Sequence, residues 1–402
     1  MTEISEKISR RLGSIDFLRG LVMVIMLLDH IREYVHADAF RFNPTDLSKT
    51  NVTLFFTRWI THLCAPTFVF LAGTSIYLQS MRGKSRAELS KFLLTRGLWL
   101  VVLEFTVIRF AMVFNLDYSF FGFAEVIWIF GVSMIVLAAL VFLPVRVVGI
   151  TGVLMIALHN LLDGINVPPA VAFAGNPAPD FWQKLWLFLH QPGFVPLFGD
   201  MKIFVAYPLI PWIGVMAAGY AFGVVYTWDA ERRRGLLLKL GATLTILFVT
   251  GSAIFTYLHT KQTDAVFVFL DFLNAAKYPP SLLFLLMTLG PAILILASAD
   301  KVRENNFAGR ILIAFGRVPL FYFILQMFVA HAFGVALNYL AGKPVGYLFA
   351  KFPESANAPP EAGFSLWVVY AAWFAGLILL YPLCVWYGRV KQKHRGFPFS
   401  YL

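Results

Sequence analysis

The stretch Ser14-Ile-Asp-Phe-Leu-Arg-Gly-Leu-Val-Met-Val-Ile-Met-Leu-Leu-Asp-His30 is an apolar run with charged residues near both of its ends. Peptide groups in hydrocarbon must be hydrogen-bonded within the chain, so such a run crosses a bilayer as an α-helix. Charged side chains inside a membrane span are costly and are functional candidates by default. We therefore expect a spanning helix near Ile15–Tyr34 that carries part of a functional site.

The rest of the chain continues this pattern. Of its 402 residues, 59% are hydrophobic and only 14% are charged, and the mean hydropathy is +0.72; a soluble domain has about 25% charged residues. We predict an all-α, polytopic integral membrane protein with roughly ten transmembrane helices in a single domain over residues 1–402. The predicted spans are Ile15–Tyr34, Leu54–Leu78, Phe92–Phe114, Phe121–Leu143, Val145–Leu162, Val205–Tyr226, Leu236–Leu258, Pro280–Ala299, Ile311–Leu340 and Leu366–Tyr387.

The basic residues lie in short clusters between the apolar runs. The net charge of +11 could suggest a nucleic-acid partner, but clusters such as MRGKSRAELSK (81–91) and DAERRRG (229–235) instead fit the positive-inside rule. With roughly ten spans, all of these clusters fall on one side of the membrane. We therefore predict that both termini are cytoplasmic, that the lipid bilayer is a partner, and that no nucleic acid is bound.

Two connecting segments are longer than a simple turn requires. Asn166–Lys202 is rich in Pro, Trp and Phe, and we expect it to form an outer loop with an interfacial helix. Lys261–Lys277 contains an apolar stretch that is too short to span, so it is expected to lie in the interface or to re-enter the membrane.

The first two spans hold the densest polar signal. Arg19 and His30 are eleven residues apart, which places them on one helix face about 16 Å apart. Asp16 accompanies Arg19 near the cytoplasmic end, and Asp29 adjoins His30 near the outer end. In the second span, His62 follows an arginine at i, i+4. The alternative interpretation is a snorkelling arginine with interfacial or structural histidines.

Further polar residues converge on the same region. In the predicted topology most lie toward the outer surface, whereas Arg317 opens the ninth span from the cytoplasmic side. Any one of them could be an ordinary contact between helices, but together they predict a polar cavity open to the outside with Arg19 and Arg317 at its inner mouth. The residues are Glu104, Arg109, Glu125, His159, Asn160, Asp163, Lys277, Tyr278, Arg317, Gln326 and His331.

This arrangement suits group transfer across the membrane. Imidazole titrates near neutral pH and can act as a general base, and the inner basic residues suit a phosphorylated donor. The chain has no glycine-rich phosphate loop, HExxH or GxSxG motif. Cys64 and Cys384 are far apart in apolar runs and have no metal-ligand spacing. We therefore expect no metal and no covalent serine intermediate.

Several motifs resemble one known family along nearly the whole chain. They are RRLGSIDFLRGLVMVIMLLDH (10–30), APTFVFLAGTSIYL (65–78), HNLLDGI (159–165), YPLIPWIGVMAAGYAFG (207–223), KYPPSLLFLLMTLGP (277–291), FGRVPLFYF (315–323) and FPFSYL (397–402). Together they resemble the bacterial branch of the heparan-α-glucosaminide N-acetyltransferase catalytic-domain family. The resemblance implies transfer of an acetyl or other acyl group from cytoplasmic acyl-CoA to an extracytoplasmic sugar or glycan, in a bacterial inner membrane.

The resemblance also suggests site roles. Lysosomal members have Asn where Asp29 stands, followed by a catalytic histidine in the next loop. His30, assisted by Asp29, is our first candidate for the base, and His36 is the second. His62 stands where those members have an acidic residue and is a supporting candidate, while Gln326 stands where bacterial relatives often have histidine. Arg19, Asp16 and Arg317 are expected to bind acyl-CoA, and Glu104, His159, Asn160, Asp163, Lys277 and Tyr278 are expected to bind the acceptor.

The rival hypothesis is a transporter or exporter of a small polar solute that uses the same cavity. The absence of an internal repeat weighs against it. A non-catalytic scaffold does not explain Arg19, Asp29 and Glu104 at their insertion cost. We keep a homodimer as a candidate assembly.

Overall fold

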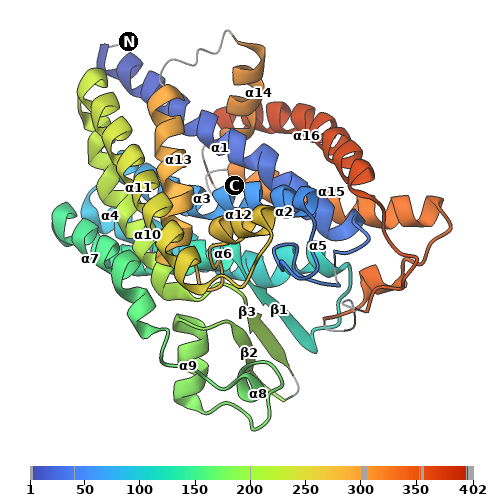
Figure 1. The fold of residues 1–402 in the computed structure, drawn as a ribbon. Coiled ribbons are helices and arrows are strands. Elements are labelled where there is room, and N and C mark those ends of the chain that lie inside the picture. Colours follow the sequence, from blue (N-terminus) through green and yellow to red (C-terminus); the bar gives the residue numbers. More distant parts are fainter. Residues whose placement is uncertain are drawn as a thin grey trace.

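Helix α1 (Glu3–Val35) is the central element of a helical bundle (Figure 1). It packs against six other α-helices, α2, α3, α13, α14, α15 and α16. The computed structural model describes residues 3–39, 41–199, 201–299, 306–352, 354, 357–394 and 396, and side chains from Gly13 onward. The closing motif 397–402 and the basic cluster at 300–305 lie outside the described residues.

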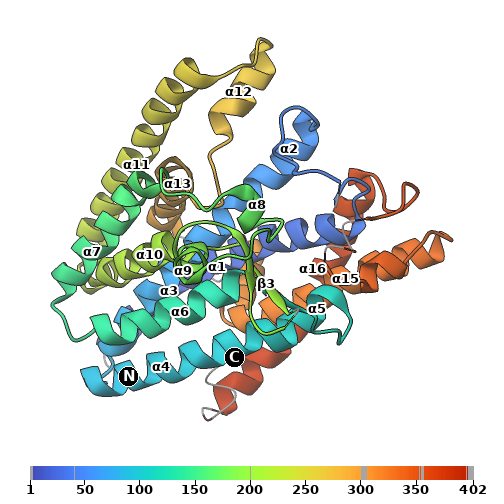
Figure 2. The same ribbon diagram turned by 90° about the horizontal axis from the view of Figure 1, so that it is seen from below.

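Fifteen further α-helices follow α1 in the described residues. Figure 2 shows that α4 and α6 lie side by side, as do α11 and α13. The helices are α2 (Val52–Trp59), α3 (Cys64–Ser80), α4 (Arg86–Leu103), α5 (Arg109–Val113), α6 (Val126–Leu140), α7 (Val145–Leu158), α8 (Pro169–Ala172), α9 (Phe181–Leu189), α10 (Leu209–Phe222), α11 (Ala230–His259), α12 (Ala265–Leu273), α13 (Leu282–Ala299), α14 (Phe307–Gly316), α15 (Pro319–Leu340) and α16 (Leu366–Lys393).

The structure supports a multi-pass membrane protein. In the described residues, seven helical segments are long and apolar enough to cross a membrane. The helix α1 is not among them, although it is long, because charged residues lie close to both ends of its apolar stretch. Each of the ten predicted spans lies largely in helix, while the number that cross the bilayer and the orientation of the termini stay predictions.

The ninth predicted span, Ile311–Leu340, is wrong as a continuous helix. It is divided into α14 and α15 by Arg317 and Val318, and Pro319 is the first residue of α15. Proline lacks a backbone N–H and disfavours helical geometry in the residue before it. Val318 accordingly has φ −129° and ψ 52°, outside the helical region.

The prediction of an all-α fold needs a second correction, because the chain also forms a three-stranded sheet in the order β1-β3-β2. Strand β1 (Phe120–Ala124) pairs in parallel with β3 (Lys202–Val205), which pairs antiparallel with β2 (Gly193–Pro196). The predicted spans starting at Phe121 and Val205 therefore begin in strands. Aromatic and β-branched residues favour strands, but hydropathy alone does not separate these short strands from the adjoining helices.

The long segments before β3 and before α13 form their own elements. Helices α8 and α9 gather with the sheet at one end of the molecule (Figure 1), around a small hydrophobic cluster that includes Leu187 and Val195. The predicted helix within Asn166–Lys202 is thus present as α9. The apolar stretch before α13 is α12, nine residues long, which packs against α11.

Local distortions interrupt two of the predicted spans. A 3₁₀ turn, Ile60–Leu63, joins α2 to α3 ahead of Pro66, and a π-helical turn, Glu104–Ile108, joins α4 to α5. Each turn contains one of the candidate polar residues. His62 lies in the 3₁₀ turn and Glu104 in the π-helical turn, where the regular α-helical hydrogen-bond pattern changes. Such distortions often occur at functional sites. Cys64 and Cys384 are buried free thiols, as predicted.

Candidate functional site

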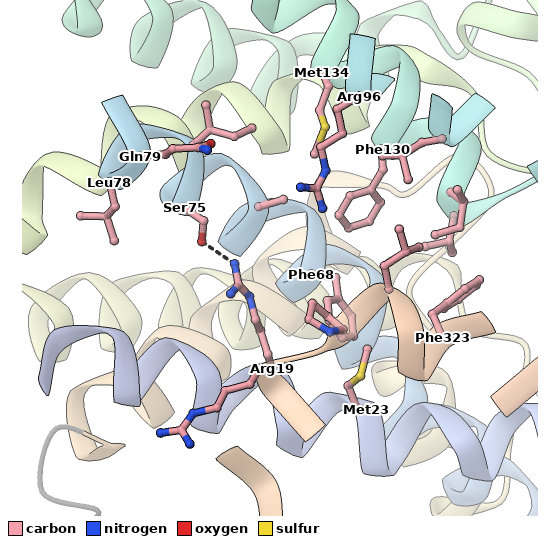
Figure 3. A pocket seen from close by; sticks show the side chains of 18 of the residues that line it. Arg19, Met23, Phe68, Ser75, Leu78, Gln79, Arg96, Phe130, Met134 and Phe323 are labelled. Atoms are coloured by element: carbon pink, nitrogen blue, oxygen red, sulfur yellow. Dashed lines mark hydrogen bonds between the residues drawn. The ribbon is translucent and has the colours of Figure 1, made fainter. Parts of the chain in front are cut away.

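A cavity with a volume of about 330 Å³ lies beside the middle of α1 (Figure 3). Much of its wall is apolar, but five cationic side chains also line it, and none of its described lining residues is acidic. We call it the basic cavity. The cationic residues are Arg19, Arg82, Arg96, Arg317 and Lys391.

Arg19 is held firmly at this cavity. Its guanidinium donates to the Ser75 hydroxyl, the dashed line in Figure 3, and to the Leu71 carbonyl oxygen at 3.3 Å. Asp16, one turn earlier on α1, pairs with it at 3.4 Å. Figure 3 shows that Arg19 and Arg96 extend toward the same space from different helices. The predicted grouping of Arg19, Asp16 and Arg317 is therefore present in the fold.

Close backbone contact between α1 and α14 brings Arg19 and Arg317 together. A Cβ atom added to Gly20 would collide with the carbonyl oxygen of Leu312, and one added to Gly316 would collide with that of Asp16. Only glycine permits the two backbones to approach so closely. Each of these glycines is next in sequence to one of the two arginines.

One face of α1 leads from the basic cavity toward the other end of the helix. Arg19, Met23 and Met26 all line the cavity. Their spacing of four and three residues continues to His30 and then to Glu33, so all five side chains share one stripe of the helix. His30 lies at the position where this stripe leaves the basic cavity.

Glu33 lines a second cavity, of about 180 Å³, on the far side of His30. Glu125 contributes the other carboxyl group, and Tyr34, Phe123 and Tyr347 are among the aromatic residues of its wall. We call it the acidic cavity. Glu125 is followed directly by Val126, which lines the basic cavity, so the N-terminal end of α6 separates the two cavities.

His30 lies between the cavities without lining either of them. Its Nδ1 atom is buried and forms no hydrogen bond within the described residues. The ring contacts Phe323 edge-on, with centroids 6.0 Å apart, and Phe323 lines the basic cavity. An imidazole with an unpaired nitrogen at this point is free to exchange a proton with a bound molecule.

Asp29 does not orient the His30 ring in this structure. Its carboxylate accepts hydrogen bonds from Arg32, at 3.0 Å, and from Arg58 of α2. Arg58 also donates to the Tyr278 hydroxyl at 3.3 Å, and the Lys277 ammonium lies 5.1 Å from the centre of the Tyr278 ring. The candidate residues Asp29, Tyr278 and Lys277 are thus brought together, around an arginine.

The other two candidate histidines differ in their surroundings. His62 is buried beside Phe284, with ring centroids 5.3 Å apart, and its Nδ1 atom forms no hydrogen bond within the described residues. His36 follows the end of α1, and its Nδ1 atom accepts a hydrogen bond from the Asp38 amide at 3.2 Å. Burial lowers the pKa of His36 and so favours the neutral form of its ring. Neither histidine lines one of the two cavities.

Glu104 and the His159 group lie apart from both cavities. The Glu104 carboxylate accepts the Trp128 amide at 2.6 Å and so caps the start of α6. His159, Asn160 and Asp163 lie at the end of α7, where the Asn160 side chain accepts the Leu282 amide at 2.8 Å. Sequence reasoning therefore grouped residues that the fold separates.

Several residues of the two cavities were missing from the sequence-based candidates. Glu33 could have been found from its position on the stripe of Arg19 and His30. Arg96 gives no comparable signal, since it lies in the polar half of the α4 sequence and only the packing of α4 on α6 turns it to the cavity. Arg32 and His190 were missed as well.

A multi-pass helical bundle with a basic cavity, an acidic cavity and a histidine between them has the features of a membrane-embedded transferase. The family model described as "Heparan-alpha-glucosaminide N-acetyltransferase, catalytic" matches residues 11–262. This match covers more than half of the chain, including most of α1 and the residues Asp29, Arg32 and Arg58, so the chain belongs to that acetyltransferase family. A search of curated proteins found no match to this chain.

Proposed function

We propose that this protein moves an acyl group from acyl-CoA, bound in the basic cavity from the cytoplasm, to a sugar or glycan acceptor on the outer side. The observation that carries the proposal is the stripe of α1 that joins Arg19, in the basic cavity, through His30 to Glu33, in the acidic cavity. A donor and an acceptor seated in the two cavities would meet beside His30.

The basic cavity suits the donor. Its cationic residues would bind the phosphates of CoA, because arginine forms strong charge-assisted hydrogen bonds with phosphate oxygens. A volume of about 330 Å³ is at the lower end of small-molecule sites. We infer that the pantetheine arm enters between Met23, Met26 and Phe68, while the nucleotide stays at the mouth.

His30 would act as the general base. The acceptor's amine or hydroxyl attacks the thioester carbonyl carbon, its proton passes to the imidazole, and a tetrahedral intermediate forms. The C–S bond then breaks, and the proton returns from the imidazolium to the leaving thiolate to give CoA–SH. An imidazole can accept the proton in the first step and return it in the second.

Asp29 has a different role in this proposal from the one that its sequence position suggests. Held by Arg32 and Arg58, it fixes the end of α1 against α2 and so positions His30, without bonding the ring. Tyr278 joins the same network through Arg58. Lys277 and Tyr278 would thus act on the acceptor indirectly, by helping to hold the Asp29–Arg58 network that positions His30.

The acidic cavity would receive the acceptor. Carboxylates accept hydrogen bonds from sugar hydroxyl groups, and Glu33 and Glu125 would also attract a cationic amine. Aromatic walls such as Tyr34 and Phe123 suit the apolar face of a sugar ring. The amine-bearing acceptor is favoured over a neutral one by the two carboxyl groups.

The direct test uses purified full-length protein with acetyl-CoA and a set of amino sugars and neutral glycans. We expect CoA release that depends on an acceptor and is lost in His30→Ala, whereas His259→Ala, an exposed histidine on α11, behaves as wild type. The rival exporter predicts solute flux in proteoliposomes that neither needs acyl-CoA nor releases CoA. That result would overturn the proposal.

A further inference from the structure

Three potential metal ligands meet at the end of α7, outside both cavities. His159 and Asp163 come from the 3₁₀ turn η3 (His159–Leu162) and the residue after it, and His190 follows the last residue of α9. One ligand atom of each lies within 4.8 Å of the others. Asp163 Oδ1 and His190 Nε2 are 2.9 Å apart.

Hydrogen bonding within the described residues leaves this cluster largely unsatisfied. His159 and His190 are each only 2% exposed. Both ring nitrogens of His159 and the Nδ1 atom of His190 are buried and make no hydrogen bond of regular geometry, although the Pro280 backbone lies close to the His159 ring. Buried polar atoms are normally paired, since an unpaired one has lost its hydrogen bonds to water without replacement. A neutral imidazole has one nitrogen with a lone pair and one N–H. The two rings therefore offer one lone pair each, and the unpaired nitrogens point to a missing partner such as a cation.

The spacing of His159 and Asp163 in the sequence explains why their side chains lie close together. His159 and Asp163 are separated by four residues, so a helical turn places them on one side. The two rings stand with centroids 5.6 Å apart at an angle of 66°, which excludes tight stacking as the purpose of their contact. The Asp163 side chain is 51% exposed, so water can reach the carboxylate side of the cluster.

We propose that His159, Asp163 and His190 bind a divalent transition-metal ion, with zinc as the best match. Two imidazoles and one carboxylate form a donor set that zinc accepts in tetrahedral geometry, with bonds of about 2.0–2.2 Å. The fourth position would be taken by water on the exposed side of Asp163. Calcium and magnesium prefer sets of oxygen donors and fit two imidazoles poorly.

The ion would tie two parts of the chain together. One part is the end of α7, and the other is the segment with α9 that continues into the sheet. Asn160, inside the cluster's turn, accepts the Leu282 amide at the start of α13. The residues just before α13 include Tyr278, which bonds Arg58. A bound ion would therefore stabilise the segment that holds Tyr278 against the Asp29–Arg58 pair.

Sequence analysis predicted no metal because it considered only local spacing. His159 and Asp163 were visible as an i, i+4 pair, but the third ligand is 27 residues beyond Asp163. The packing of α9 against the end of α7 supplies it. This proposal does not depend on the acyltransferase proposal.

The test uses the full-length protein in detergent, stripped with a chelator, dialysed and then titrated with Zn²⁺. Bound metal is measured by mass spectrometry, and cobalt substitution gives a visible absorption band that reports nitrogen and oxygen ligands. We expect about one ion per chain for wild type and for the control His259→Ala. We expect His159→Ala and His190→Ala to lose at least ten-fold in affinity, and Asp163→Asn to weaken binding less.

Size-exclusion profiles and thermal unfolding without metal show whether each variant is folded. Wild-type protein with a normal profile that binds no stoichiometric zinc overturns the proposal, and this result needs no variant. Zinc binding that persists unchanged in both histidine variants also overturns it. Loss of binding in folded variants, together with a rise in the unfolding temperature of wild type on adding zinc, supports it.

Discussion

The carboxylate of Asp29 and the guanidinium of Arg58 form an ion pair across the contact of α1 with α2, with side chains only 12% and 10% exposed. Arg32, one turn later on α1, donates to the same carboxylate at 3.0 Å. The pair lies next to His30 in sequence but leaves its ring unbonded. Asp29 thus connects helices, and the histidine beside it remains available for chemistry.

Breaking this pair should destabilise the protein strongly. Asp29→Asn leaves two buried guanidinium groups without their counter-charge, and loss of one partner of a buried pair costs about 3–5 kcal/mol. We expect a clear fall in the thermal unfolding midpoint in detergent. Lys351→Ala is the matched control, because it removes the half-exposed pair with Asp117, and an exposed pair contributes about 0–1 kcal/mol. Equal midpoints for both variants would contradict the role given to Asp29.

Replacing the two candidate bases should separate their roles. His30→Ala is expected to lower kcat by about 10²–10⁴-fold, the usual contribution of a general base, while acyl-CoA still binds. His36→Ala should keep most of the activity, because His36 follows the end of α1, beyond Glu33, and its Nδ1 atom already accepts the Asp38 amide. Steady-state kinetics and a separate CoA-binding measurement decide between them. Activity that survives in His30→Ala and vanishes in His36→Ala would make His36, and not His30, the general base.

Donor affinity should depend on the arginines of the basic cavity. Arg19→Ala removes a charge-assisted contact of about 1.5–3 kcal/mol, so Kd for acyl-CoA should rise roughly 10- to 100-fold, with little change in kcat. Arg310→Ala, an exposed arginine on α14 outside the cavity, is the control. Calorimetric titration with acetyl-CoA measures both. A Kd unchanged in Arg19→Ala would remove the basic cavity from consideration as the donor site.

The contact between α1 and α14 should be sensitive to a single methyl group. Gly20→Ala forces a Cβ atom into the Leu312 carbonyl, so α14 and Arg317 must move, and we expect both lower stability and weaker acyl-CoA binding. Gly13→Ala is the control on the same helix, because a Cβ atom there meets nothing within 4 Å. It should be neutral or slightly stabilising. Thermal unfolding and CoA titration of the two variants give the answer.

Changes in the acidic cavity should affect the acceptor and not the donor. Glu33→Gln is expected to raise KM for an amino-sugar acceptor several-fold more than for a neutral sugar, because a charge-assisted contact is replaced by a neutral one. Kd for acyl-CoA should stay constant. The exposed Glu231→Gln on α11 serves as control. An equal effect on charged and neutral acceptors would argue against recognition of an amine by Glu33.

The membrane class and most helical segments could be predicted from the sequence, because both depend on local composition. Hydropathy finds a span, and a spacing of eleven residues places Arg19 and His30 on one face. The same reasoning missed the break at Arg317 and Val318. Apolar residues continue on both sides of Arg317 and Val318, so hydropathy alone predicts one helix, although Gly316 and Pro319 mark the break.

The partners of the candidate residues could not be predicted, because they come from distant parts of the chain. Asp29 adjoins His30, which suggested a carboxylate–histidine pair, but Arg58 competes for the carboxylate from another helix. Glu104 looked like a polar group aimed at a cavity, whereas the packing of α4 against α6 gives it a backbone amide to accept. Helix packing decides both cases, and a single sequence does not encode it locally.

The single face of α1 that connects both cavities also limits how this protein can vary. Removing one residue between Met26 and His30 would turn everything beyond it by about 100°, so His30 and Glu33 would point away from Arg19. Hydrophobicity and membrane insertion would hardly change. Length, and not only composition, is therefore under constraint in this helix: substitutions of one apolar residue for another are tolerable there, but insertions and deletions are not.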